Sequence, residues 1–219
     1  MTDGHDHGTH EDDHDHAEHA HGQEHGGEHA HGGEHDHGYR AALEAMRKDA
    51  GHYYADHFDW RGHQPPDGWT GPRFFPVAED WQLEAWLDAD APGTGSAVTL
   101  PTSTGKMRDM TIAGQLVFEV GGHEQRLTAY ASKGQDEEEG WLFIPFRDAT
   151  SGAETYGSGR YIDVPPPDDG DSAIYDVDFN LAYNPSCAYS PAYDCPFPPP
   201  GNRLSIRVPA GEMVPFEEH

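Results

Sequence analysis

Twelve histidines fall within the first 38 residues of this 219-residue chain, and most of them stand in His-x-His pairs. The pairs are His5 and His7, His14 and His16, His19 and His21, His29 and His31, and His35 and His37. Neutral imidazole is a common ligand for transition metals, and residues two apart in an extended chain point the same way, so one pair can meet one ion. The spacing therefore predicts that residues 1–38 bind a divalent transition metal, with zinc, nickel, cobalt or copper as candidates.

A second interpretation of the histidine tract needs no specific metal function. Aspartate and glutamate residues are interleaved with the histidines, which are never contiguous, so the tract does not have the pattern of an affinity tag. A low-complexity acidic tail of this kind can keep a protein dissolved and chelate metal only incidentally. In the first interpretation the chain is a metal buffer or metal chaperone, and in the second its activity belongs to the remaining residues.

A second group of polar residues lies in FIPFRDATSGAETYGSGRYID, residues 143–163, directly after an apolar run. Polar groups in that position can line a pocket, and arginine is suited to binding a carboxylate or a phosphate. Two polar residues of a later alternating segment are expected to join them. The candidate pocket residues are Arg147, Asp148, Thr150, Ser151, Glu154, Tyr156, Arg160, Asp178 and Asn180.

The two arginines of this group are predicted to lie close together. The apolar run ends at Phe146, and the glycines that follow let the chain turn back so that Arg160 begins the next strand. Two like charges need acids or an anionic ligand between them. One hypothesis is an enzyme or small-molecule binder whose pocket takes a small anionic ligand. The alternative is a structural buckle in which Arg147 and Arg160 pair with acids to fix loops.

Other patterns that carry chemistry are weak or incomplete in this chain. Cys187 and Cys195 enclose seven residues, more than the two to four of a zinc knuckle, so a disulfide or two small buried thiols is expected. The segment Gly157-Ser158-Gly159 lacks the third glycine of a dinucleotide fingerprint, and Thr104–Met107 lacks the features of a phosphate-binding loop. No nucleotide cofactor is therefore expected.

The charge of the chain excludes two classes of partner. The formal net charge is −27, from 13 basic and 40 acidic residues. Eleven of the acidic residues and none of the basic ones fall in residues 1–38, so the rest carries −16. Phosphate-rich partners such as nucleic acids and anionic membranes would be repelled. A carboxylate-rich surface with only three lysines also indicates adaptation to high salt.

The organisation of the chain predicts one folded domain after the tail. Residues 1–38 lack apolar periodicity and are expected to be disordered without metal, whereas residues 39–219 suffice for a single core. Helix formers without proline predict a helix over 39–58, and later segments alternate with a period of two. The predicted fold is mainly β, an antiparallel sandwich or barrel with one N-terminal helix and a disordered tail. With neither a signal peptide nor a membrane-spanning run in the sequence, a cytoplasmic location is expected.

Residues 143–163 and DFNLAYNPSCAYSPAYDCPFPPPGNRLSIRVPAGE, residues 178–212, together resemble a bacterial and archaeal family known as domain of unknown function 1684. The resemblance extends over about 39–215 and is closest over about 141–212. It implies a shared domain but no particular reaction. The histidine tract lies outside the family pattern, so a metal function would be an addition particular to this chain.

Overall fold

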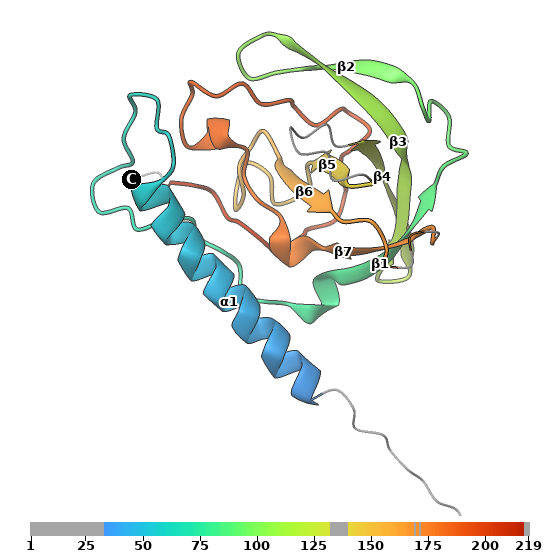
Figure 1. Ribbon diagram of the computed structural model, residues 1–219, viewed down its shortest axis with the longest axis horizontal. Coiled ribbons are helices and arrows are strands. Elements are labelled where there is room, and N and C mark those ends of the chain that lie inside the picture. The colour runs from blue at the N-terminus through green and yellow to red at the C-terminus, as the bar shows by residue number, and fades with distance from the viewer. Residues whose placement is uncertain (1–32, 132–139, 169, 171, 217–219) are drawn as a thin grey trace, which may run out of the picture.

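The computed structural model of the protein describes residues 33–131, 140–168, 170 and 172–216 (Figure 1). Within these ranges the chain forms one α-helix, α1 (Gly33–Asp56), followed by seven strands. The strands are β1 (Gln82–Asp88), β2 (Ala97–Pro101), β3 (Met107–Val120), β4 (His123–Ala131), β5 (Leu142–Phe146), β6 (Arg160–Val164) and β7 (Ile174–Asp178). Short 3-10 helices are η1 (Glu79–Trp81), η2 (Phe179–Leu181) and η3 (Ser186–Ala188).

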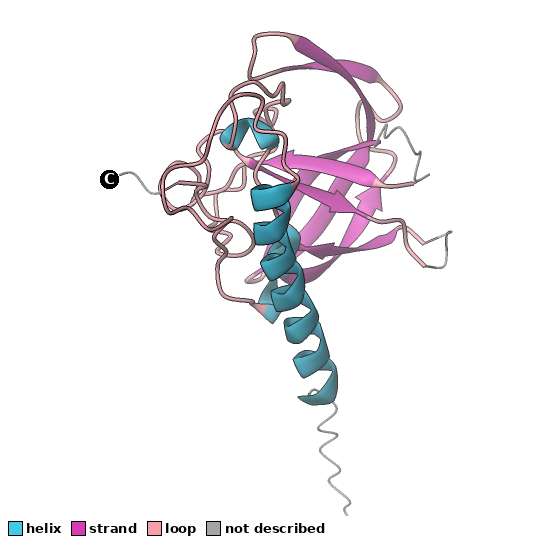
Figure 2. Cartoon of the chain, turned by 60° about the vertical axis from the view of Figure 1, so that its left-hand side comes forward, coloured by secondary structure: helices cyan, strands magenta, loops and turns pink. Residues whose placement is uncertain are grey.

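The strands form a single curled antiparallel sheet, which is a half-barrel rather than two stacked sheets (Figures 1 and 2). Its strand order is β6-β5-β4-β3-β1-β7, and β2 pairs with β3 away from this path. The sheet therefore runs through neighbours in sequence from β3 to β6, while β1 lies between β3 and the distant β7. The prediction of a mainly β, antiparallel, barrel-like fold with one N-terminal helix is confirmed.

The long strand β3 pairs with β1, β2 and β4, and it bends at a glycine. Its first half pairs with β2 and its second half with β1, and the register of its pairing with β4 shifts between Ile112 and Gly114. A Cβ on Gly114 would lie 2.7 Å from the carbonyl oxygen of Asp88, so only glycine allows this approach. The bend places the β2–β3 hairpin beside the half-barrel, next to the segment that follows β7.

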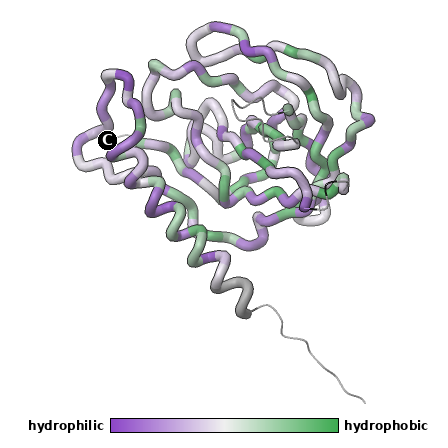
Figure 3. Tube along the Cα trace, viewed as in Figure 1, coloured by the Kyte–Doolittle hydropathy of each residue, from purple (hydrophilic) through white to green (hydrophobic). Residues whose placement is uncertain are grey.

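The core fills the concave side of the sheet, as the period-two patterns predict. Leu116, Phe118, Leu127 and Ile144 are all buried there. Phe179, which is wholly buried, packs at the centre with its ring 5.6 Å from that of Phe118 and 5.5 Å from that of Phe146. Apolar residues follow the strands, whereas helix α1 carries many hydrophilic residues (Figure 3).

Helix α1 begins at Gly33, earlier than the predicted start at residue 39, and ends at Asp56. Polar contacts attach it to the segments that flank the sheet. The Tyr39 hydroxyl donates to the Asp178 carboxylate at 2.5 Å, and the Arg47 guanidinium donates to the carbonyl oxygens of Phe75 at 2.9 Å and Asn180 at 3.3 Å. Its last turns end in an aromatic cluster that comprises Tyr54, Phe58, Trp60, Trp69, Tyr189, Tyr193 and Phe216.

Among the described residues, no helix has the length and apolar character to cross a bilayer.

Two stretches that alternate in sequence are not strands. Alternating apolar residues from Tyr175 to Tyr183 predict one strand, but β7 ends at Asp178, because that side chain accepts a hydrogen bond from the Asn180 amide at 2.9 Å and turns the chain into η2. Leu204, Ile206 and Val208 alternate in the same way and predict another strand; Leu204 and Val208 are buried, but the backbone around them is irregular. Its hydrogen bonds go to the loop after β5, for example from the Leu204 amide to the Arg147 carbonyl oxygen at 2.8 Å.

Candidate functional site

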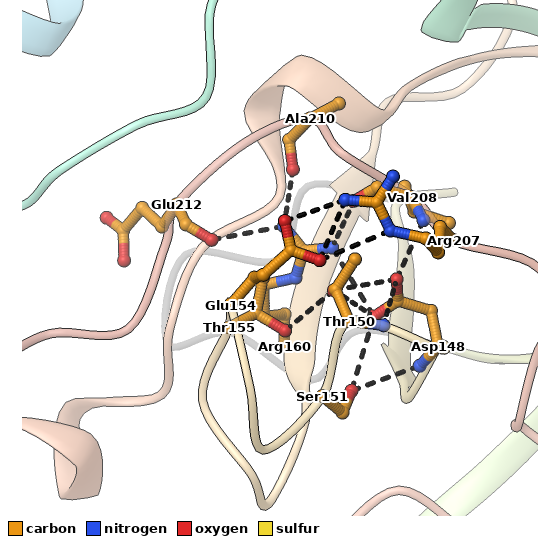
Figure 4. A network of polar contacts seen from close by, with 10 residues as sticks. All are labelled: Asp148, Thr150, Ser151, Glu154, Thr155, Arg160, Arg207, Val208, Ala210 and Glu212. Atoms are coloured by element: carbon orange, nitrogen blue, oxygen red, sulfur yellow. Dashed lines mark hydrogen bonds and ion pairs between the residues drawn. The ribbon is translucent and has the colours of Figure 1, made fainter.

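The side chain of Arg160, the first residue of β6, lies in a buried polar network (Figure 4). Its guanidinium donates to the carbonyl oxygens of Ala210, of Glu212 at 3.1 Å and of Val208 at 2.9 Å. The Asp148 carboxylate lies 3.6 Å away. Because the Arg160 side chain is only 1% exposed, the guanidinium does not face a cavity. It holds the C-terminal segment 208–212 against the sheet.

Asp148 organises the loop between β5 and β6 from the other side of this ion pair. Its carboxylate accepts hydrogen bonds from the Thr150 hydroxyl at 2.8 Å, the Ser151 hydroxyl at 3.2 Å and the Val208 amide at 2.7 Å. Burial lowers the pKa of Arg160 to about 10, although Asp148 and Glu212 favour its charged form. The guanidinium therefore stays charged at neutral pH. The three carbonyl acceptors and the ion pair of Arg160 favour the structural buckle over a ligand pocket for this part of the loop, although its buried Nε has no hydrogen-bond partner.

The other predicted pocket residues lie in separate places. Glu154 forms a half-exposed ion pair with Arg207 at 2.7 Å (Figure 4), and Arg147 donates to the Gly157 carbonyl oxygen. Asp178 and Asn180 lie against α1 and the segment before β1, where the Asn180 amide nitrogen donates to the Ala78 carbonyl oxygen at 2.8 Å. The loop brings together Arg160, Asp148, Thr150 and Ser151, but it does not unite all nine candidates around one cavity.

A buried carboxylate that the sequence patterns did not indicate lies next to this network. Glu212 is 5% exposed and accepts hydrogen bonds from the Asn184 amide and the Tyr189 hydroxyl, both at 2.7 Å. Burial raises the pKa of Glu212 to about 7, because the loss of water outweighs these hydrogen bonds and the attraction of Arg160. A glutamate that changes protonation near neutral pH is thus built into the interior.

A pocket lies beside β5 and β6, under residues 183–196, which are called the arm below. It has a volume of about 660 Å³. Its lining is Arg61, Arg108, Asp109, Met110, Phe143, Tyr161, Tyr183, Pro185, Ser186, Tyr193, Asp194, Cys195 and Pro196. The arm is attached to the edge of the sheet by two hydrogen bonds between the backbones of Tyr161 and Tyr183, both of 2.9 Å. This cavity is called the arm pocket, and none of the nine predicted pocket residues lines it.

Aromatic rings and two arginines give the arm pocket its chemical character. The rings of Phe143 and Tyr161 lie 4.8 Å apart, edge to face. Arg61 stacks over the Tyr193 ring with 4.0 Å between its guanidinium carbon and the ring centroid. Arg108, at the start of β3, is exposed and donates to the Asp194 carbonyl oxygen at 3.0 Å. The pocket thus combines aromatic surfaces with two guanidinium groups, and Asp109 and Asp194 add two carboxylates to its lining.

One sequence feature could have indicated the arm pocket. Phe143 alternates with the core residues Leu142 and Ile144, so it lies on the face of β5 that points away from the core. The continuous apolar run 141–146 predicts a strand that is buried on both sides, but Phe143 is only partly buried. An aromatic side chain on that face needs a cover, and here the cover is the arm. The sequence pattern does not predict which segment covers Phe143.

The predicted metal ligands fall outside the described residues, except that the backbone of His35 and His37 belongs to α1. In the part of the chain that the structure describes, no three His, Cys, Asp or Glu side chains are grouped to hold a metal ion. The metal-binding hypothesis therefore rests on the spacing of the histidines in the sequence.

Comparison with known proteins places the folded domain in a family. The pattern of the family described as protein of unknown function (DUF1684) matches residues 67–213. The chain is also similar to the solution NMR structure of an uncharacterised protein of Haloarcula marismortui, with 32% identity and a TM-score of 0.61 over 82% of this chain and 96% of that one. No curated protein matches the chain. On the family match and this structural likeness, the chain belongs to the DUF1684 family.

Proposed function

We propose that the β domain binds a small molecule with an aromatic ring and an anionic group in the arm pocket. The observation that carries this proposal is the pairing of Arg61 and Arg108 with four aromatic side chains around one cavity of about 660 Å³. A volume of this size is typical of small-molecule sites. Arginine that lines a cavity in a chain of net charge −27 is suited to an anionic ligand.

The two halves of such a ligand have separate partners. The ring of the ligand packs against Phe143 and Tyr161, which both line the cavity and lie edge to face. The anionic group meets Arg108, which is exposed and has donors beyond the one that Asp194 accepts. Arg61 is oriented by its stacking on Tyr193 and by an ion pair with Asp59 at 3.6 Å, and it adds a second guanidinium to the pocket.

Titration with phenyl phosphate tests the proposal, because this probe carries a ring and an anion. Binding is followed by NMR chemical shifts, with phenol and inorganic phosphate as probes that each lack one half. We expect Arg108→Gln to weaken binding of phenyl phosphate by about tenfold or more, since a hydrogen bond to a charged group contributes about 1.5–3 kcal/mol. Arg207→Gln is the matched control, because Arg207 pairs with Glu154 outside the pocket. Equal binding by both variants would refute the assignment to the arm pocket.

For residues 1–38 we propose a second function, the binding of divalent transition metal. The supporting observation is the set of five His-x-His pairs with interleaved carboxylates. Calorimetry with zinc chloride compares the whole chain with a variant in which the ten paired histidines are glutamine. Uptake is expected at pH 7.5 and fades below about pH 6.5, where protons compete for imidazole. If the glutamine variant takes up as much zinc as the wild-type chain, the paired histidines are not a metal site and the chelation is incidental.

A further inference from the structure

The two cysteines of the chain lie in contact. The Cys187 amide donates to the Sγ of Cys195 at 3.3 Å, and both cysteines are free thiols. Cys187 lies in η3, and Cys195 lies near the end of the arm. Two backbone contacts with the turn after β2 fix Cys195, from the Ser103 amide to the Cys195 carbonyl oxygen at 2.9 Å and from the Cys195 amide to the Ser103 hydroxyl at 3.1 Å. The Cys195 sulfur is therefore held in place beside η3.

The surroundings of the two sulfurs differ. Cys195 is buried at the wall of the arm pocket, whereas Cys187 is half-buried. Hydrogen bonding from the Cys195 thiol foremost, and from the hydroxyls of Ser103 and Tyr156, lowers the pKa of Cys187 to about 7, and the same contact raises the pKa of Cys195. At neutral pH a large fraction of Cys187 is therefore thiolate, whereas Cys195 keeps its proton.

This asymmetry fits two thiols with different roles better than two inert buried thiols. A thiolate is the reactive form of cysteine, and the best attacking thiol has a pKa near the ambient pH. A protonated thiol in contact with it can resolve a mixed disulfide. A zinc site is not supported, because no third ligand joins the cysteines among the described residues.

We propose that Cys187 and Cys195 form a reactive dithiol that reduces small organic disulfides. The Cys187 thiolate attacks one sulfur of the disulfide RSSR, so a Cys187–SR bond forms as the RS–SR bond breaks, and RS⁻ leaves. The Cys195 thiol then loses its proton to the released RS⁻ or to water, and its sulfur attacks the Cys187 sulfur. The Cys187–Cys195 disulfide forms as the second RS⁻ leaves. Overall the two cysteines are oxidised by two electrons, and one RSSR is reduced to two thiols.

The reaction is tested with the reduced full chain and 5,5′-dithiobis(2-nitrobenzoate), in the presence of a chelator that strips metal from the histidine tract. The wild-type chain is expected to consume one probe molecule, release two equivalents of thionitrobenzoate and contain an internal disulfide by peptide mass mapping. Cys195→Ser is expected to release one equivalent and keep the mixed disulfide on Cys187. Cys187→Ser is expected to react at least about tenfold more slowly, because the remaining thiol is buried.

A hydroxyl deletion separates the proposed chemistry from simple accessibility. Tyr156→Phe removes one donor to the Cys187 sulfur, so the pH midpoint of Cys187 alkylation by iodoacetamide should move upward. Tyr53→Phe is the matched control, since Tyr53 is 52% exposed on α1. The proposal is overturned if the wild-type chain carries a separate adduct on each cysteine without an internal disulfide, which needs no variant to detect. The reaction needs no ligand in the arm pocket, so its failure leaves the anion-binding proposal intact.

Discussion

Arg160 and Asp148 form an ion pair with 3.6 Å between Nη2 and Oδ1, and the exposed fractions of the two side chains are 1% and 0%. Each residue also has hydrogen-bond partners of its own. Arg160 donates to carbonyl oxygens of residues 208–212, and Asp148 accepts from hydroxyl groups of the β5–β6 loop. The pair therefore joins three segments that are far apart in sequence. Removal of either member leaves the other as an uncompensated charge in the interior.

Replacement of Arg160 by leucine is expected to lower the free energy of unfolding by about 3–5 kcal/mol, because the Asp148 carboxylate is left buried without its cation. Urea unfolding followed by circular dichroism measures the loss. Arg207→Leu is the matched control, since its ion pair with Glu154 is largely exposed and such pairs contribute about 1 kcal/mol or less. Similar small losses in both variants would contradict the assignment of a structural role to the buried pair.

The buried carboxylate of Glu212 predicts a pH dependence of stability. Its pKa is raised from 4.5 to about 7, so the folded state binds this proton more tightly than the unfolded state. The contribution of Glu212 to the free energy of unfolding is therefore most favourable below pH 4.5. It falls as the pH rises from 4.5 to about 7. Above about pH 7 the buried charged carboxylate costs on the order of 3 kcal/mol.

Glu212→Gln should remove that dependence, because glutamine has no proton to lose. The measurement is the difference in unfolding free energy between wild type and variant at pH 5 and pH 8. The stability of the variant relative to the wild type is expected to be higher at pH 8 than at pH 5. An exposed Glu84→Gln variant controls for the change in net charge. A constant difference across the two pH values would show that Glu212 does not titrate in this range.

Gly211 is predicted to be intolerant of any side chain. Its φ is +75°, and a Cβ would lie 2.8 Å from the Phe179 carbonyl oxygen and would also contact Ala182. Gly211→Ala is expected to cost several kcal/mol, because backbone strain of about 1–2 kcal/mol is added to overlap in the packed interior. Gly105→Ala has a similar φ of +80° but open space around its Cβ, so it isolates the strain. If urea unfolding shows the same loss of stability in Gly211→Ala and Gly105→Ala, small shifts of the neighbouring atoms relieve the overlap at Gly211.

The thermal midpoint of the protein is predicted to rise steeply between dilute buffer and molar potassium chloride. Residues 39–219 carry a net charge of −16, and salt at about 1 M screens their mutual repulsion to about 3 Å. Differential scanning calorimetry of the full chain measures the midpoint across the salt series. A midpoint that is already high and unchanged across the series would argue against adaptation to high salt.

The sequence predicted the fold better than the site, and particular residues show why. Alternation places Leu116 and Phe118 on the core face of β3 regardless of what packs on them, so a periodic pattern predicts burial locally. The partners of Arg160 are backbone carbonyl oxygens about 50 residues later, and a carbonyl has no sequence signature. The arm pocket likewise depends on a contact of Tyr161 with Tyr183 that no local pattern predicts.

The pairing of β1 with β7 also has a consequence for newly made chains. β1 ends at Asp88, but its outer neighbour begins only at Ile174, and the segment that binds Arg160 extends to Glu212. At a synthesis rate of about 5–20 residues per second, the interval between β1 and Glu212 is roughly 6 to 25 seconds. During that interval the apolar faces of β1, β3 and β4 lack the residues that later cover them. Folding of the sheet therefore completes only after Glu212 has left the ribosome, and chaperones that shield nascent apolar strands act mainly before that point.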